Sequence, residues 1–565
     1  RRYADCLAMH ADLEEYIAAS RQPVSVLQLA QLVEKHRPVP GKPVKRAPPP
    51  AAPPPVVRPP VDPSDLPTPR PEITTVTSAG RELRKLLQPE PVWPDASTET
   101  TEPQLRIEIP PPPPPKESPA PPPEALRPAR QRPDDLRWDV VEEHLDEASF
   151  LHGQWEEALR SPGYTLAAIA GSPERRLLAH LGGLVLGGPR VAERLLAPAL
   201  ASDEPGTVFA AAFALLEGGR PADFEALVGA LEEGDPVQRA AICRAMAVVP
   251  RDDLGRQLTP LLEKVPALRT EVLEVLGQLR VDPGLPLDPL ASSGKPSMEV
   301  LALRLAQVAP DRLEPAAVER AYASPVPDVC AAGFETGLMT RSRDAFAACE
   351  SAVEARSPGF STAALLLGLS GDDKSVATLL QALADRDFQR DVVFALGFSG
   401  RVSAADALLA AMEDETLAPL VAEAFAAITG LRVEKEMAVR LDRWGPEVKA
   451  DDDGVERSRS EAALAQPDPD EVARWWKEAR PKLDPARRWL RGQRWSTEAL
   501  LDELEHGPAR RREALALDVA VRTRGQVQIS WNGLSSRQHR ELGEARIARR
   551  QIHEGSYRDF NRGRP

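Results

Sequence analysis

The chain has 565 residues, enough for several domains or for one long repeat array. Its formal net charge of −14 argues against non-specific binding to nucleic acid or to an anionic membrane. Hydrophobic residues make up 42% of the chain but aromatic residues only 5%, a composition that favours close-packed helices over a β-sandwich.

The four cysteines, Cys6, Cys243, Cys330 and Cys349, form no CxxC pair and lie within apolar helical patterns. They are therefore predicted to be buried free thiols in a reducing compartment rather than disulfide or zinc ligands. The sequence contains no apolar run of about 18 residues and no signal-peptide pattern, so we expect a cytoplasmic protein without a membrane partner. The start at Arg1 leaves open whether residues precede it.

Residues 1–36 have the pattern of a small helical hairpin, either a cap or a docking module. Residues 37–134 follow as a proline-rich arm that includes the run Pro110–Pro115. Because each proline removes a backbone donor and fixes φ, this arm is predicted to be a disordered, semi-rigid linker. Within it, Ser78–Leu87 is predicted to form a short helix, either a linear binding motif or an inert island.

An internal repeat predicts the fold of residues 135–445. LLLGLSGDDKSVATLLQALAD at residues 365–385 matches FALGFSGRVSAADALLAAMED at residues 394–414, with an offset of 29 residues. Weaker copies continue toward the N-terminus, with turns at steps of 29 to 31 residues: Pro205, Pro236, Pro266, Pro296, Pro327, Pro358, Phe388 and Leu417. Eight units of this length predict an all-α, HEAT-like α-solenoid preceded by N-terminal cap helices.

Each unit has the pattern of two helices. Val376, Leu379, Leu380 and Leu383 form an i, i+3, i+4, i+7 apolar stripe, which the next unit repeats. The pair Gly368 and Gly371 and its copy Gly397 and Gly400 are predicted to end the preceding helices in a left-handed conformation.

After the solenoid we predict an acidic, proline-marked connection at 446–470, a tryptophan-rich helical region at 471–553 and a disordered tail at 554–565. Trp475, Trp476, Trp489 and Trp495 are candidate partner-binding residues, and the alternative is that they pack in a core. The run Arg510–Arg512 is predicted to be an exposed helix start, and nucleic-acid binding by it is disfavoured by the acidic chain.

The sequence contains no GxSxG, P-loop, dinucleotide-binding or HExxH pattern, so no catalytic, cofactor or metal residue is predicted. His144 and His152 lie among carboxylates on one predicted helix. Since residues eight apart on a helix are two turns apart, we interpret them as part of a solvated polar face.

Three segments resemble a family of uncharacterised bacterial HEAT-repeat proteins that are often encoded beside type VI secretion genes: WDVVEEHLDEASFLHGQW at residues 138–155, AAITGLRVEKE at 426–436, and PDPDEVARWW at 467–476 with the Arg-rich stretch at 488–520. The resemblance covers residues 135 to 550. It implies an accessory or adaptor role near a contractile secretion machine, and it carries over no catalytic residue.

The sequence therefore favours a cytoplasmic scaffold that needs no cofactor and whose solenoid groove binds protein partners. The resemblance implies that these partners are components of the secretion system. Binding to nucleic acid is disfavoured. The alternative is an enzyme on a HEAT scaffold, similar to a bilin lyase or a DNA glycosylase. The identity of the partner, the binding face and the oligomeric state stay open.

Overall fold

The computed structural model describes residues 136–340, 342–433, 437, 461 and 463–560, all within one compact unit that spans Pro121–Pro565. The predicted hairpin at 1–36, the proline-rich arm at 37–134 and most of the acidic connection at 446–470 lie outside the described residues.

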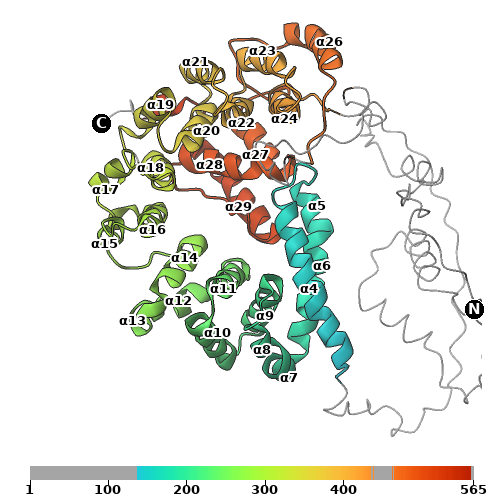
Figure 1. The fold of residues 1–565 in the computed structure, drawn as a ribbon, viewed down its shortest axis with the longest axis vertical. Coiled ribbons are helices and arrows are strands. Elements are labelled where there is room, and N and C mark those ends of the chain that lie inside the picture. Colours follow the sequence, from blue (N-terminus) through green and yellow to red (C-terminus); the bar gives the residue numbers. More distant parts are fainter. Residues whose placement is uncertain (1–135, 341, 434–436, 438–460, 462, 561–565) are drawn as a thin grey trace, which may run out of the picture. The chain divides into compact units, whose positions relative to one another are not determined.

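The described chain is all-α and forms a HEAT-like solenoid, as predicted. The N-terminal cap contains α4 (Trp138–Ala158), α5 (Leu166–Gly171), α6 (Pro173–Leu186), α7 (Gly188–Val191), the π-helix η2 (Ala192–Leu196) and α8 (Ala197–Ala199). Helix pairs follow, and successive pairs stack side by side (Figure 1).

The first helix of each pair forms the more buried layer. These first helices are α9 (Pro205–Gly218), α11 (Pro236–Val248), α14 (Arg269–Leu279), α16 (Pro296–Ala306), α18 (Pro327–Met339), α20 (Phe360–Ser370), α22 (Gln389–Ser399) and α24 (Ala418–Thr429). Each begins at, or within three residues of, a turn position predicted from the sequence. The predicted phase of the eight repeats is therefore confirmed.

The second layer is less regular. It contains α10 (Pro221–Glu233), α12 (Leu254–Leu258), α13 (Leu261–Lys264), α15 (Asp288–Ala291), α17 (Pro315–Ala321), α19 (Ala345–Ala355), α21 (Asp373–Ala382) and α23 (Val402–Ala411), with 3₁₀ turns at Pro266–Leu268 and Pro310–Arg312. The predicted apolar stripe lies on α21 and its C-cap Leu383: Val376 and Leu379 are buried, while Leu380 and Leu383 are half-buried.

The glycine prediction was right for one member of each pair. Gly371 and Gly400 end α20 and α22 with φ of 65° and 67°, the left-handed conformation that glycine adopts at low cost. Gly368 and Gly397 instead lie inside those helices. A Cβ on Gly368 would be 2.1 Å from the carbonyl oxygen of Ala395, so glycine is needed there for close packing between neighbouring repeats.

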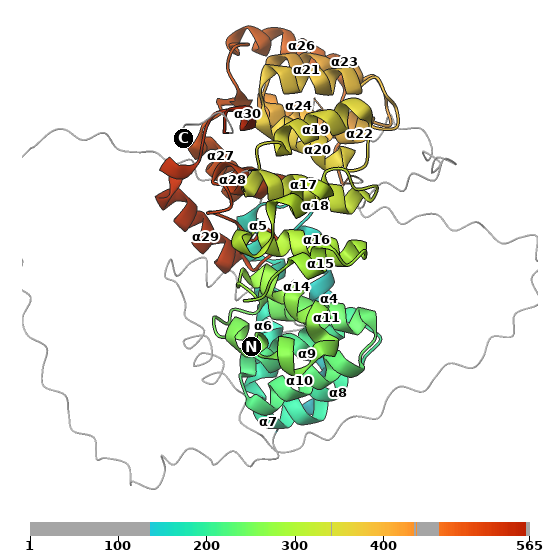
Figure 2. The same cartoon turned by 90° about the vertical axis from the view of Figure 1, so that its left-hand side faces the viewer.

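The C-terminal region comprises α26 (Pro469–Ala479), η7 (Arg480–Lys482), a two-stranded antiparallel ladder of β1 (Trp489–Leu490) and β2 (Gln493–Arg494), α27 (Thr497–His506), η8 (Ala509–Arg511), α28 (Arg512–Arg522), α29 (Ser535–Ile547), η9 (Arg549–Gln551) and α30 (Tyr557–Phe560). It packs along the solenoid, where α28 contacts α18 and α20 while α27 and α29 contact α5 (Figure 2).

Candidate functional site: the edge covered by the C-terminal region

The carboxyl ends of the first helices lie along one edge of the solenoid. Each helix leaves its last carbonyl groups without an intrahelical partner, and the aligned peptide dipoles make that end partly negative. A row of such ends therefore favours donors and positive charge. The C-terminal region supplies both.

Residues 488–492 cover the ends of the last three first helices. The guanidinium of Arg488 donates to the carbonyls of Leu369 and Phe398, both at 2.8 Å, and so joins α20 to α22. The backbone N–H of Trp489 donates to Gly400 O at 2.8 Å, and that of Arg491 to Ala427 O at 2.7 Å. The β1–β2 turn thus acts as a shared cap for three repeats.

Side chains further along the C-terminal region cap earlier helices in the same way. Arg537 donates to Ala247 O at the end of α11 and to Gln278 O in α14, each at 3.3 Å. Gln528 donates to Gln307 O, just after α16, at 3.0 Å. Together with α20, α22 and α24, six of the eight first helices have carboxyl ends that accept hydrogen bonds from the C-terminal region.

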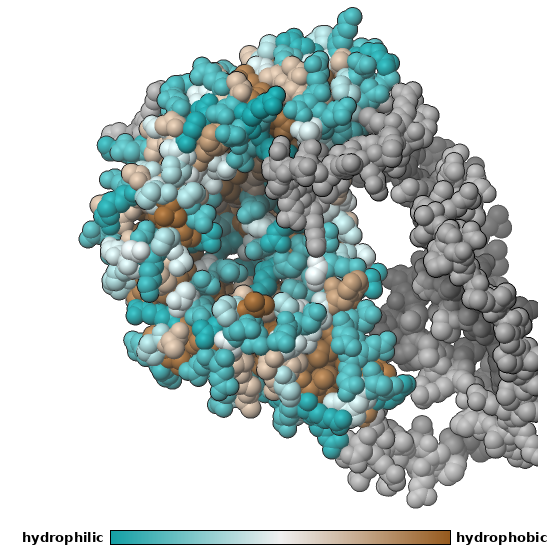
Figure 3. All heavy atoms as spheres, viewed as in Figure 1, coloured by the Kyte–Doolittle hydropathy of each residue, from teal (hydrophilic) through white to brown (hydrophobic). Residues whose placement is uncertain are grey.

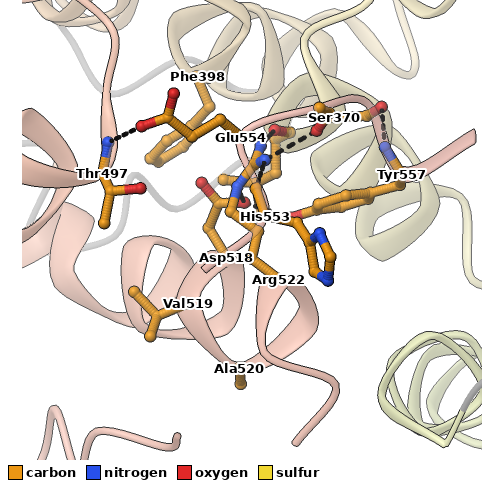
Figure 4. A network of polar contacts seen from close by, with 12 residues as sticks. Ser370, Phe398, Thr497, Asp518, Val519, Ala520, Arg522, His553, Glu554 and Tyr557 are labelled. Carbon is orange, nitrogen blue, oxygen red and sulfur yellow. Dashed lines mark hydrogen bonds and ion pairs between the residues drawn. The ribbon is translucent and has the colours of Figure 1, made fainter. Parts of the chain in front are cut away.

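A buried network at the centre of this edge holds Arg522 (Figure 4). Its fully buried guanidinium donates to Asp518 Oδ1 at 2.7 Å, to His553 O at 2.7 Å and to Leu369 O at 2.9 Å. Asp518 also accepts a hydrogen bond from the hydroxyl of Tyr557. Burial raises the pKa of that hydroxyl well above its usual value, so Tyr557 stays a neutral donor.

The run Arg510–Arg512 is not the exposed helix start that the sequence predicts. Arg511 and Arg512 are only 2% and 1% exposed, and burial lowers the pKa of each to about 10. Arg511 lies over the ring of Phe398, 3.8 Å from its centroid, and Arg512 donates to Gln538 Oε1 at 2.5 Å. The prediction failed because three consecutive arginines normally indicate solvent, whereas here aromatic faces and α29 receive them.

The tail also differs from its prediction. Residues 557–560 form α30, and the side chain of Tyr557 is fully buried, so order extends beyond the predicted boundary at 554. Arg558 in the same helix pairs with Glu350 of α19 at 2.5 Å. Residues 561–565 lie outside the described residues. Several arginines of this part of the chain thus bind within the protein instead of forming a free basic surface.

A carboxylate joins the cap to the C-terminal region. Glu174, at the start of α6, is buried and accepts from Trp155 Nε1 at 3.1 Å. It also accepts from the backbone N–H of Ser535 at 2.9 Å and from its hydroxyl at 2.9 Å. Because Ser535 begins α29, the carboxylate caps the positive end of a helix that is 361 residues away in sequence.

The four candidate tryptophans do not form one exposed platform. Trp476 and Trp495 are buried, while Trp475 and Trp489 are half-buried. Trp476 donates through Nε1 to Asp406 Oδ1 at 2.9 Å. The guanidinium groups of Arg488 and Arg522 lie 4.6 and 4.4 Å from the ring centroid of Trp495. These positions favour the alternative role in packing, and partner binding by these rings stays a prediction.

The histidine prediction needs correction. His152 stacks on Phe209 with 3.8 Å between ring centroids, and burial lowers its pKa to about 4, so it is not part of a solvated face. His144 Nδ1 lies 3.1 Å from His180 Nδ1 on α6. Among the described residues, no three His, Cys, Asp or Glu side chains are grouped to hold a metal ion.

The cysteine prediction is confirmed where the structure can test it. Cys243, Cys330 and Cys349 are buried and free, and Cys6 lies outside the described residues. Burial raises the pKa of the Cys243 thiol to about 12, so the thiol form persists at neutral pH. None of the helices in the described ranges is long and apolar enough to cross a bilayer.

Comparison with known proteins adds little. No family model and no curated protein matches the chain. Human deoxyhypusine hydroxylase is a solved structure with 16% sequence identity, and the match covers 51% of this chain and 95% of that one. Its TM-score of 0.20 is too low to support any argument about function.

Three residues that build this edge, Arg488, Arg522 and Glu174, were not predicted from the sequence as functional residues. An available signal was the enrichment of arginine after the solenoid, because a region that covers helix carboxyl ends needs cationic donors.

Proposed function

We propose that the chain is a protein-binding scaffold or adaptor. The observation that carries this proposal is the covering of six helix ends by the C-terminal region, together with the link from Glu174 to Ser535. These contacts hold the repeats in one curvature. A surface that is already ordered loses less conformational entropy when a partner binds, so a fixed solenoid suits a scaffold.

The resemblance to bacterial HEAT-repeat proteins supports a more specific role. Under this proposal the partner is a component of a type VI secretion system, and the scaffold works in the cytoplasm beside it. The pairing of Arg558 with Glu350 and the capping by Arg537 support a protein partner over nucleic acid, since they engage two arginines of the C-terminal region within the protein.

A pull-down from lysate of a bacterium with an active secretion system tests both levels. The full chain would be immobilised at about 50 and 200 mM salt, with and without nuclease. We expect a captured secretion component that resists both treatments, because apolar and hydrogen-bonded interfaces depend less on salt than phosphate contacts do.

The control is the double variant Arg549→Ala, Arg550→Ala, which removes two exposed cations without touching the buried ones. Loss of all captured protein with nuclease, or with this variant at 200 mM salt, would favour nucleic-acid binding. A nuclease-resistant partner unrelated to secretion would keep the scaffold and remove the secretion role.

A further inference from the structure

Among the described residues, the C-terminal region donates no hydrogen bond to the carboxyl ends of α9 and α18, and the edge is open at α9. Next to the covered end of α11, an apolar cavity of about 650 Å³ lies between α6 and the end of α9. Its lining includes Leu178, Leu181, Val185 and Leu186 of α6 and Phe213 of α9, and Glu217 is its one charged residue. Leu186 is 89% exposed, which is unusual for a leucine. The surface of the described residues is otherwise mostly hydrophilic, and it is hollowed near its middle (Figure 3).

A second cavity of about 430 Å³ continues the first, because both are lined by Pro250, Leu534 and Ser536. It is rich in arginine, with Arg251, Arg280, Arg537 and Arg540 against two acids, Asp252 and Glu541. Arg540 is exposed and makes no ion pair within the part of the chain that the structure describes. Arg251 already pairs with Asp253, and Arg280 and Arg537 both pair with Glu541, so Arg540 is the cation that this cavity offers to a ligand.

We infer that these two cavities form one docking groove for an amphipathic helix of a partner protein, with a leucine-rich face and carboxylates at one end. The apolar half would bury the leucine face, as helix-in-groove interfaces do, and the carboxylates would meet Arg540 and fix the direction of the helix. The bound helix would extend the line of the C-terminal region over the end of α9, where Arg251 donates to Leu216 O at 2.9 Å.

This inference rests on the proposed scaffold function and names its docking surface. A glycine provides a clean way to block the groove. Gly182 of α6 lines the apolar cavity, and a Cβ added there would meet no atom within 4 Å. Gly182→Glu should therefore fold normally, because glutamate is a better helix former than glycine. Binding over it would have to bury an unpaired carboxylate.

The matched control is Gly229→Glu. Gly229 lies in α10, outside both cavities, and a Cβ there also meets no atom within 4 Å. Arg540→Glu reverses the sign at the basic end and tests orientation separately.

The experiment selects binders to the full chain from a displayed library of helical peptides, then measures the best one by fluorescence anisotropy. We expect leucine-striped sequences with acidic residues at one end. Gly182→Glu should weaken binding by at least about tenfold, Arg540→Glu by about three- to tenfold, and Gly229→Glu by less than about twofold.

Three outcomes would overturn the proposed docking groove. They are that no peptide is enriched, that the enriched peptides are basic, or that the selected peptides bind Gly182→Glu as well as the wild type. A change in the sedimentation of the unliganded chain on Gly182→Glu would identify a second copy as occupant and overturn the partner helix. Failure of the groove and failure of the scaffold are distinguishable in the lysate pull-down. Equal capture by the wild type and Gly182→Glu removes only the groove, whereas capture by neither removes the scaffold.

Discussion

The repeat array and the C-terminal region are held together by different interactions. Between repeats the contacts are apolar and recur at a fixed spacing, with residues such as Leu379 and Leu408 in equivalent buried positions. The C-terminal region is held to the array by residues that occur once, such as Arg488, Arg522 and Glu174. Apolar stripes stabilise each neighbour in the same way, whereas buried polar groups stabilise only one arrangement.

The largest effect should come from the repeat core. Leu379 is 0% exposed, so Leu379→Ala should cost about 2–5 kcal/mol of unfolding free energy, and Leu379→Asp more because it adds an unpaired buried charge. The half-buried neighbour Leu380 is the matched control, and Leu380→Ala should cost clearly less. Urea denaturation measures both, and equal losses at the two positions would contradict this phase of the repeat.

Arg522 tests the contribution of the residues that occur once and hold the C-terminal region to the array. Arg522→Ala should cost about 3–5 kcal/mol, because it leaves the buried Asp518 carboxylate without its cation; α20 keeps the hydrogen bond that Arg488 donates to Leu369 O. Arg494 is exposed, so Arg494→Ala should change stability by less than about 0.5 kcal/mol. Thermal unfolding compares the two. Similar small effects would mean that the network in Figure 4 contributes little.

A smaller effect is expected at the link to the cap. Glu174→Ala leaves the buried donors of Trp155 and Ser535 unpaired, at a cost of about 1–3 kcal/mol. Hydrogen exchange should accelerate at the start of α29 and in α6, while α20 to α24 stay protected. The exposed Glu233→Ala serves as a control. Uniform acceleration across all repeats would show that the two parts unfold as one unit.

The smallest expected effect is on the stability of the fold at low pH. Burial acts to raise the pKa of Asp372, but hydrogen bonds from Ser375, Ser370 and Ser556 outweigh it and hold the pKa at about 2. Since the folded pKa is depressed, the stabilisation is present above the unfolded value of about 4 and is lost as the pH falls toward 2.

Ser556→Ala removes the donor that comes from the C-terminal region. It should cost about 1 kcal/mol at neutral pH and move the acid-induced loss to higher pH, which melts between pH 2 and 5 can follow. Ser297→Ala, at an exposed site at the start of α16, is the comparison. An unchanged pH profile would contradict a role for Ser556 in holding this carboxylate.

The sequence allowed the helix pairs, their phase and the all-α class to be predicted, because an apolar stripe of period 3.6 is a local property. The same local reasoning misassigned Arg511, Arg512 and His152 to solvent-exposed positions. In each case the side chain is received by an element distant in sequence, such as Phe398 for Arg511 and Phe209 for His152. No window of neighbouring residues contains that information.

The sequence by itself thus determined where the helices of the array begin and how they stack, since turns and stripes recur every 29 to 31 residues. Only the tertiary structure decided which charged residues are buried and what they hold. Glu174 reaches a partner 361 residues away, and Arg522 reaches Leu369 across 153 residues. A charged side chain can be buried only where hydrogen-bond partners in the protein replace its hydration. Only the folded chain brings such distant partners together.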